Sequence, residues 1–248
     1  MSFIGITRSS MQPDHALIAP DSHVKSTLPG WTKSMVTILI SPQMGARFTQ
    51  YFALMEKGGT SGPAPEGTTR FFYVLEGAAS ITVGKKTTAL TPGAYGFLPA
   101  DTPHAIKAGK ETRLLVFEKP YDEVDGVEPP HVVISHEKSV KATPFLGDKD
   151  ALLKILLPEI PSFDFAINIF QFQPGGTLPF VEVHVMEHGM LFLEGQGVYR
   201  MSEKWYVVGK GDVIWMAPYC AQWFVASGKT PSRYIYYKDM HRDPSVML

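Results

Sequence analysis

The stretch FFYVLEG, residues 71–77, recurs as GMLFLEG, residues 189–195, 118 positions further along the chain. The match continues without a gap, because Gly93 in TPGAYG lies 118 positions before Gly211 in GKGDVI. Few residues are identical between the two copies, but the turn glycines and the strand pattern repeat in the same order. A repeat of this length indicates two duplicated domains rather than a solenoid.

The segments between the turn residues are short and rich in β-branched and aromatic residues, as in ASITVG (79–84), FAINIF (165–170) and QGVYRM (196–201). Such runs, separated by turn signals about every eight to twelve positions, predict an all-β protein built as a sandwich or small barrel. Helical periodicity is scarce, and KDALLKILLP (149–158) is the best short helical candidate.

The domain boundary is predicted in PYDEVDGVEPPH, residues 120–131, which is acidic, rich in proline and without apolar rhythm. We therefore expect two tandem antiparallel β-barrel domains, an N-terminal one over residues 1–125 and a C-terminal one over residues 126–248. Each length is sufficient for a barrel with its own core.

The composition is that of an ordinary globular protein, with 248 residues, 44% apolar residues and a formal net charge of -1. This charge balance disfavours nucleic-acid binding. The N-terminus has no apolar signal region, and no stretch approaches the ~20 apolar residues that cross a bilayer, so we expect a cytoplasmic protein. Cys220 is the only cysteine, which agrees with a reducing compartment, and we expect it to be a small apolar filler.

The run VEVHVMEH, residues 181–188, has the residues of a metal site. In an extended strand, the side chains of Glu182, His184 and His188 point to one face. A single such histidine is usually structural, but three potential ligands within seven residues of an apolar stretch are costly to bury without compensation. Imidazole nitrogen and carboxylate oxygen suit a divalent first-row metal, and the amide of Gln222 in a second hairpin offers a fourth ligand.

The two copies differ at these positions. The N-terminal copy has Ala64 opposite Glu182, Glu66 opposite His184 and Arg70 opposite His188, and it keeps only His104, opposite Gln222. We therefore expect the N-terminal domain to be metal-free and structural. In the last strand of the C-terminal copy, Tyr234 and Lys238 replace Leu114 and Glu118, and they share strand parity with Tyr236, so a phenol and an ammonium can face the interior together.

Paired glycine-bounded motifs of this kind resemble the cupins, small antiparallel β-barrels, and the duplicated chain resembles a bicupin. The altered ligand set, followed by GQGVY, KGDVIWMAPY and YIYYKDMHRDP and preceded by the N-terminal HALIAPDSHVKSTLPGW, closely resembles the (S)-ureidoglycine aminohydrolase family over the whole chain.

The resemblance implies a manganese enzyme that hydrolyses (S)-ureidoglycine to (S)-ureidoglycolate and ammonia in the catabolism of allantoin and purines. By position it implies that Glu182, His184, His188 and Gln222 hold Mn²⁺ and that Tyr199, Tyr234 and Lys238 contact the substrate. Among these we expect Glu182, Lys238 and Tyr234 to take part in catalysis. The spacing alone also permits Fe²⁺, Ni²⁺ or Zn²⁺.

Two other classes of function remain open at the level of sequence. Cupins with several metal-ligating histidines include dioxygenases and decarboxylases, although a glutamine in place of the second-motif histidine favours hydrolysis. A non-catalytic binding module has the same fold. We expect a small ureido compound as the partner, no nucleic acid and no membrane, and a homo-oligomer.

Overall fold

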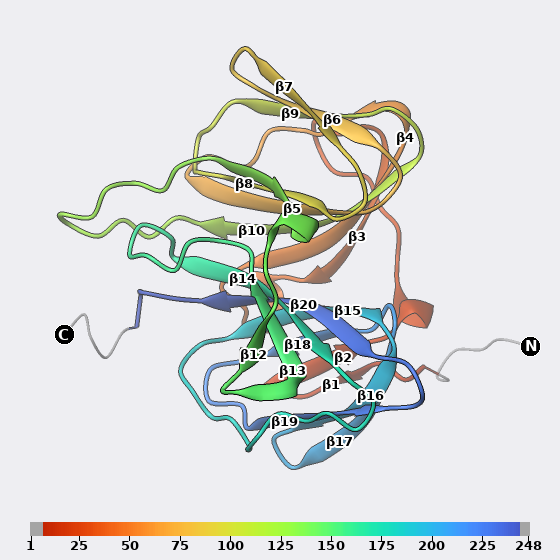
Figure 1. Cartoon of the computed structure of the whole chain (residues 1–248). Coiled ribbons are helices and arrows are strands. Elements are labelled where there is room, and N and C mark those ends of the chain that lie inside the picture. The colour runs from red at the N-terminus through yellow and green to blue at the C-terminus, as the bar shows by residue number, and fades with distance from the viewer. Residues whose placement is uncertain (1–6, 244–248) are drawn as a thin grey trace, which may run out of the picture. The chain divides into compact units, whose positions relative to one another are not determined.

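The computed structural model describes residues 7–243, whose regular structure is almost entirely β-strand (Figure 1). The chain forms two compact units. One comprises residues 24–140 with 161–163, and we call it the N-terminal barrel. The other comprises residues up to His23, residues 141–160 and residues from Asp164 onward, and we call it the C-terminal barrel. Every strand pairing in both barrels is antiparallel, as the sequence predicts for an all-β protein.

The N-terminal barrel is a nine-stranded sheet in the order β11-β8-β5-β10-β4-β9-β6-β7, with β3 also paired to β4. Its elements are β3 (Thr32–Ile40), the 3-10 helix η2 (Pro42–Met44), β4 (Thr49–Thr60), β5 (Thr68–Glu76), β6 (Ala79–Val83), β7 (Lys86–Leu90), β8 (Ala94–Leu98), β9 (His104–Ala108), β10 (Thr112–Pro120), β11 (Val133–His136) and the 3-10 helix η3 (Glu137–Ser139).

The C-terminal barrel contains an eight-stranded sheet in the order β1-β2-β18-β15-β20-β14-β13-β12 and a three-stranded sheet in the order β17-β16-β19. Its elements are β1 (Ser10–Met11), β2 (His15–Ile18), the 3-10 helix η1 (Pro20–Ser22), β12 (Thr143–Phe145), β13 (Asp148–Ile155), β14 (Phe165–Phe172), β15 (His188–Glu194), β16 (Gln196–Met201), β17 (Lys204–Gly209), β18 (Val213–Met216), β19 (Gln222–Ser227) and β20 (Ser232–Asp239).

The boundaries of the two units differ from the predicted ranges 1–125 and 126–248 because each barrel covers one sheet edge with a distant segment. Strand β2, near the N-terminus, pairs with β18 and so belongs to the C-terminal barrel. Strand β11, which follows the predicted boundary, pairs with β8 and belongs to the N-terminal barrel. Strands β8 and β18 are equivalent in the repeat, and an uncovered edge strand invites pairing with other chains.

The best short helical candidate, residues 149–158, is not a helix. Most of this segment is strand β13, which pairs on one side with β12 and on the other with β14. Ala151, opposite Phe172, is fully buried in the core of the C-terminal barrel. The pairing with two neighbours satisfies the backbone groups of the segment, so tertiary context outweighs the helical preference of leucine and lysine.

Aromatic rings fill much of the interior of the C-terminal barrel. The rings of Phe192 and Tyr234 lie 5.2 Å apart between centroids, and those of Phe224 and Tyr234 lie 5.6 Å apart. Such edge-to-face and tilted packing is favourable for aromatic side chains and fixes their rotamers. Within residues 7–243, no helix has the length and apolar character that a membrane span requires.

Candidate metal centre and active site

A cavity of about 140 Å³ lies inside the C-terminal barrel. All seven residues that the sequence analysis assigned to a site contribute to its wall. Aromatic and sulfur-containing side chains make up most of the rest. The complete lining is Phe145, Phe170, Leu178, Glu182, His184, Met186, His188, Met190, Tyr199, Gln222, Tyr234, Tyr236 and Lys238.

The segment 181–188 reaches this cavity in a different way from the predicted continuous strand. Only His188 lies in a strand, as the first residue of β15, while Glu182 forms an isolated bridge with Gln222. In that bridge the Glu182 amide donates to the Gln222 carbonyl at 2.8 Å, and the Gln222 amide donates back at 2.9 Å. His184 lies between Glu182 and His188 in the chain, in irregular backbone. The side chains of Glu182, His184 and His188 therefore reach one cavity because the loop is bridged to Gln222, and not because they alternate along one strand.

The two imidazoles point at each other, with Nε2 of His184 and Nε2 of His188 3.2 Å apart. Nδ1 of His184 lies 3.2 Å from the carbonyl oxygen of Met186, and Nδ1 of His188 lies 3.0 Å from that of Tyr237. A carbonyl oxygen can only accept, so each Nδ1 carries the hydrogen and each Nε2 presents a lone pair. Backbone carbonyls that fix the tautomer in this way are typical partners of metal-ligating histidines.

Protonation does not relieve the repulsion between these lone pairs near neutral pH. Burial, and to a smaller degree the proximity of His184, lowers the pKa of His188 from 6.5 to about 3. Burial also lowers the pKa of His184. A cation between two neutral imidazole nitrogens removes the repulsion, so this pair fits a divalent metal ion.

Gln222 and Glu182 supply oxygen atoms at the same cavity. The Gln222 Nε2 atom lies 3.0 Å from His184 Nε2, and the Tyr199 hydroxyl donates to Gln222 Oε1 at 2.8 Å. A half-turn of the amide would present Oε1 to a metal and let Nε2 donate to the Tyr199 oxygen. Burial raises the pKa of Glu182, with Lys238 opposing the shift. Glu182, His184 and His188 do not have ligand atoms all within 4.8 Å of one another, so the carboxylate must turn inward to join them.

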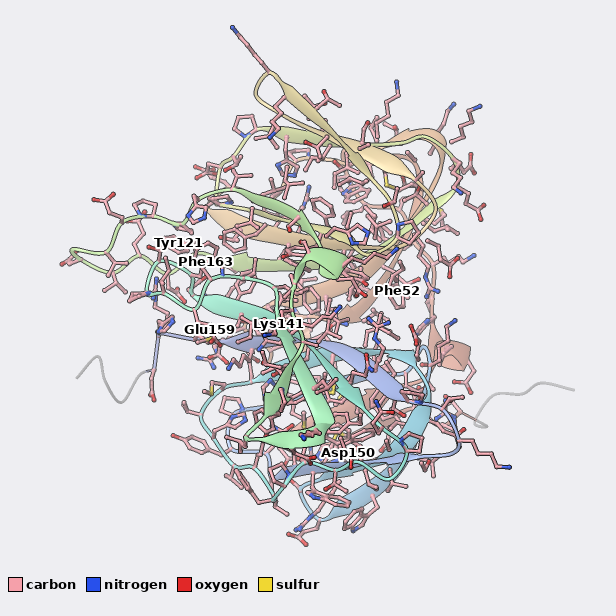
Figure 2. The ribbon with its side chains drawn as sticks, viewed as in Figure 1. Phe52, Tyr121, Lys141, Asp150, Glu159 and Phe163 are labelled. Atoms are coloured by element: carbon pink, nitrogen blue, oxygen red, sulfur yellow. The ribbon has the colours of Figure 1, made fainter. Side chains whose placement is uncertain are left out.

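The last strand, β20, provides the cationic and phenolic part of the wall. As parity predicts, Tyr234, Tyr236 and Lys238 all face the cavity. The Lys238 Nζ atom lies 3.8 Å from a carboxylate oxygen of Glu159. Glu159, labelled in Figure 2, lies in the connection between β13 and β14. Burial raises the pKa of Tyr234 well above its usual value, so this phenol stays protonated and can donate a hydrogen bond.

Three residues of this region have no role predicted from the sequence. Tyr236 lines the cavity and packs edge-on against His188, with 5.5 Å between ring centroids. Asn168 donates to the Tyr236 hydroxyl oxygen at 3.2 Å from the neighbouring strand β14. The single polar residue within FAINIF was a usable signal for Asn168. Glu159 lies outside any strand, so no periodicity could have indicated that it reaches Lys238.

The equivalent region of the N-terminal barrel is organised around Arg70, whose side chain is 1% exposed. Its Nη1 atom lies 2.9 Å from His104 Nε2 and donates to the Gly62 carbonyl at 2.7 Å, while Nε donates to Glu118 at 2.7 Å. The Tyr51 hydroxyl donates to the same Glu118 oxygen at 2.9 Å.

Arg70 is equivalent in the repeat to His188, and Glu118 is equivalent to Lys238. The N-terminal barrel therefore contains a cationic side chain where the C-terminal barrel has a candidate metal ligand. It also contains a carboxylate in place of the lysine. The guanidinium satisfies the buried acceptors around it, and a structural, metal-free role for this barrel stays a prediction.

The chain was compared with known proteins and structures. The family described as "Cupin domain" matches residues 51–118, within the N-terminal barrel. The chain is 43% identical over 244 residues to a protein of Oryza sativa subsp. japonica named probable (S)-ureidoglycine aminohydrolase, covering 98% of this chain and 78% of the relative. It is 43% identical over 242 residues to the (S)-ureidoglycine aminohydrolase of Arabidopsis thaliana, covering 97% of this chain and 80% of the relative.

Solved structures agree with the observed fold. The putative glyoxylate-induced protein of Pseudomonas aeruginosa superposes with a TM-score of 0.89 at 29% identity, covering 98% of this chain and 94% of that chain. Oxalate decarboxylase of Bacillus subtilis, studied for its Mn(II) centres, has a TM-score of 0.70 at 10% identity, covering 91% and 77%, and shows the fold alone. The two barrels thus form a bicupin, and the chain belongs to the (S)-ureidoglycine aminohydrolase family.

Proposed function

We propose that the protein hydrolyses (S)-ureidoglycine to (S)-ureidoglycolate and ammonia. The observation that carries this proposal is the pair of neutral imidazole nitrogens that face each other 3.2 Å apart. They lie in a small cavity whose wall also offers a carboxylate, an amide and an ammonium. The named activity of the relatives that match 97–98% of this chain supports the reaction.

We propose Mn²⁺ as the metal ion, with Glu182, His184, His188 and Gln222 as its ligands. A set of nitrogen and oxygen donors without thiolate suits such an ion. When bound, the ion would act as a Lewis acid toward the substrate's carboxylate and amine.

The side chains around the ligands would bind and orient the substrate. Lys238 faces the cavity with a side chain that is only 21% exposed, so its ammonium can attract the substrate's carboxylate or ureido oxygen in a setting of reduced screening. Tyr234 and Tyr199 are protonated donors, because burial raises the pKa of each phenol well above its usual value. Together these groups would distinguish a ureido acid from an apolar molecule of the same size.

Glu182 is the proposed general base. In the metal-free site burial raises the pKa of Glu182, and as a base the carboxylate would take the proton on an oxygen that the metal ion does not hold. In the net reaction, the water oxygen forms a bond to the substrate carbon and the bond from that carbon to the amine nitrogen breaks. The proton that Glu182 takes from water passes to the leaving nitrogen, which departs as ammonia.

The test is an ammonia assay on freshly generated (S)-ureidoglycine with the purified protein, before and after removal of metal by a chelator. We expect ammonia release without oxygen consumption, lost with the metal and restored by Mn²⁺. Activity that is unchanged in the metal-free protein would refute the proposal, and oxygen consumption would point instead to an oxygenase.

Variants locate the reaction in one barrel. His184→Ala and His188→Ala should each lose bound Mn²⁺ and activity together. His104→Ala, which removes an imidazole at the equivalent place in the N-terminal barrel, is the matched control and should keep both. Glu182→Gln should fold normally and lose most activity, and near-normal turnover in this variant with metal bound would rule out the role of Glu182 as base.

A further inference from the structure

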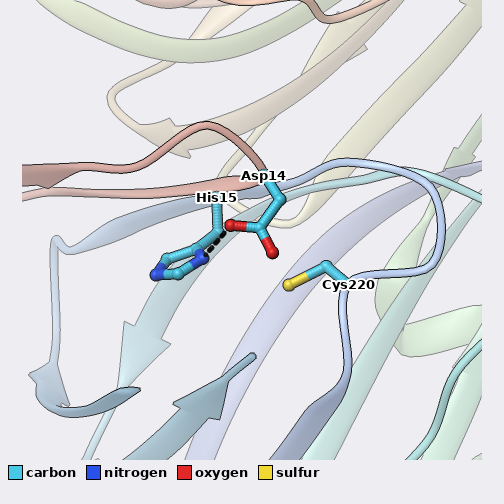
Figure 3. A group of neighbouring side chains, drawn as sticks. All are labelled: Asp14, His15 and Cys220. Atoms are coloured by element: carbon cyan, nitrogen blue, oxygen red, sulfur yellow. Dashed lines mark hydrogen bonds and ion pairs between the residues drawn. The ribbon is translucent and has the colours of Figure 1, made fainter. Parts of the chain in front are cut away.

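A second cluster of metal-ligating side chains lies in the C-terminal barrel, outside the cavity described above. Asp14 and His15, at the start of β2, meet Cys220, which lies just before β19 (Figure 3). One ligand atom from each of the three side chains lies within 4.8 Å of the other two. Among residues 7–243, Asp14, His15 and Cys220 are the one group of three metal-ligating side chains whose ligand atoms lie this close together. None of the three lines the substrate cavity.

The expectation that Cys220 is a simple apolar filler describes only one side of its surroundings. Its side chain does belong to the hydrophobic core cluster of the C-terminal barrel. Its sulfur, however, lies 3.6 Å from the hydroxyl oxygen of Ser202, which also donates to the second carboxylate oxygen of Asp14. The thiol therefore faces a polar group at the edge of the core.

The surroundings of His15 match those of a metal ligand. Its ring is 2% exposed, Nδ1 lies 2.8 Å from an Asp14 carboxylate oxygen, and Nε2 lies 2.8 Å from the hydroxyl oxygen of Tyr206. If Nδ1 binds a cation, Nε2 carries the hydrogen and donates it to Tyr206, which is the usual arrangement for an imidazole in a metal site. The Asp14 carboxylate would then bind the cation instead of the Nδ1 hydrogen.

We propose that Asp14, His15 and Cys220 bind a zinc ion, with the Ser202 hydroxyl or a water molecule as the fourth ligand. One imidazole nitrogen, one carboxylate oxygen and one thiolate sulfur form a donor set that favours Zn²⁺ in tetrahedral coordination. Binding breaks the S–H bond of Cys220, and its proton passes to solvent. The thiolate distinguishes this site from the candidate manganese site, which contains only nitrogen and oxygen donors.

The position of this zinc site gives it a structural consequence. Cys220 lies in the loop that leads from β18 to Gln222, and the loop is already connected to β2 because Ala217 donates to the Asp14 carbonyl at 2.9 Å. The amide of Tyr219 in the same loop donates to the carbonyl of His184 at 2.8 Å. Zinc would cross-link β2 to this loop, stabilise the C-terminal barrel and hold the backbone next to two candidate manganese ligands.

Cobalt(II) provides a specific probe, because Co²⁺ bound to a thiolate has a charge-transfer absorption in the near ultraviolet. Cys220 is the only cysteine of the chain, so no other residue can produce this band. We expect Co²⁺ added to the full-length, Mn²⁺-loaded protein to produce the band with a stoichiometry of one, and Zn²⁺ to abolish it by displacement. Cys220→Ala should lose the band while it keeps bound Mn²⁺, which shows that the variant is folded.

Variants of the other ligands make the test decisive. His15→Gln and Asp14→Asn should abolish the band or weaken Co²⁺ binding strongly, and Tyr206→Phe should weaken it by about 10- to 100-fold. Asp21→Asn, an exposed position in η1, is the matched control and should have no effect. Absence of the band in folded wild-type protein would overturn the proposal. A band of unchanged affinity in His15→Gln and Asp14→Asn would overturn it as well, since the thiol would then bind metal without these partners.

The readout is independent of catalysis, so it distinguishes this proposal from the proposed function. Zn²⁺ should also raise the melting temperature of the wild-type protein and leave that of Cys220→Ala unchanged, because a ligand that binds only the folded state stabilises it. An equal rise in both proteins would show that the zinc binds elsewhere and would contradict the assignment.

Discussion

Acidification of the metal-free protein should destabilise the C-terminal barrel through His188. Burial and the neighbouring His184 lower the pKa of His188 from 6.5 to about 3 in the folded state. Between these values the unfolded chain binds a proton that the folded chain does not. The contribution of His188 to stability is therefore complete above about pH 6.5 and is lost progressively as the pH falls toward 3.

The size of the effect follows from the same shift. A difference of 3.5 pH units, at about 1.36 kcal/mol each, corresponds to about 5 kcal/mol when the pH reaches 3. At pH 5 the unfolded histidine is almost fully protonated and the folded one is not, so about 2 kcal/mol should already be lost relative to neutral pH.

Urea unfolding at several pH values measures this loss. Trp205, Trp215 and Trp223 lie in the C-terminal barrel and Trp31 lies in the other, so tryptophan fluorescence in a Trp31→Phe background reports the C-terminal barrel. Between pH 7.5 and 5, the free energy of unfolding should fall by about 2 kcal/mol more in this protein than in its His188→Asn derivative. Equal pH dependence of the two proteins would refute the argument that His188 is held neutral.

Three further substitutions test buried polar contacts of the two barrels. Tyr199→Phe removes the hydroxyl that hydrogen-bonds to the Gln222 amide and would hold it with Oε1 toward the metal, so it should weaken Mn²⁺ binding by about 10- to 100-fold in a metal titration, whereas Tyr51→Phe should leave it unchanged. An equal effect of both would contradict a specific role of Tyr199. Arg70→Met leaves the Glu118 carboxylate without its cation and should lower the free energy of unfolding by about 3–5 kcal/mol, and a loss below 1 kcal/mol would contradict the importance of this ion pair.

Local sequence patterns were sufficient to predict the duplicated all-β architecture. Turn glycines such as Gly77 and Gly195 have positive φ angles and mark the same turn in both copies, so their spacing reveals the repeat. Strand parity also placed Tyr234 and Lys238 on the cavity side of β20. The spacing of turn glycines and the alternation of side chains along a strand are both local features, so they can be read from neighbouring residues in the sequence.

Features that depend on long-range pairing were not predictable in the same way. Nothing in HALI, residues 15–18, indicates that it pairs with β18, about 200 residues away in the chain, and this pairing changes the boundaries of both units. Residues 149–158 have a helical pattern, yet neighbours on both sides make the segment a strand. The contact of Glu159 with Lys238 likewise arises only once a turn has been folded back onto β20.

All seven predicted site residues line one cavity of the C-terminal barrel, but the local geometry of two of them differs from the prediction. Strand parity predicted that Glu182 and His184 lie in the same strand as His188. Instead, a backbone bridge to Gln222 positions Glu182, and His184 lies in irregular backbone. The bridge could not be predicted because it joins the two hairpins of the C-terminal barrel. It is also the contact that brings the amide and carboxylate groups to the same cavity.

The most direct test of the metal centre is pulsed electron paramagnetic resonance of the protein with one equivalent of Mn²⁺ and ¹⁵N-labelled histidine. We expect coupling to two imidazole nitrogens, lost together with the bound Mn²⁺ in His184→Ala and in His188→Ala and unchanged in His104→Ala. Coupling to no imidazole nitrogen, or coupling that survives intact in both of the first two variants, would contradict the assignment of the metal to the C-terminal barrel.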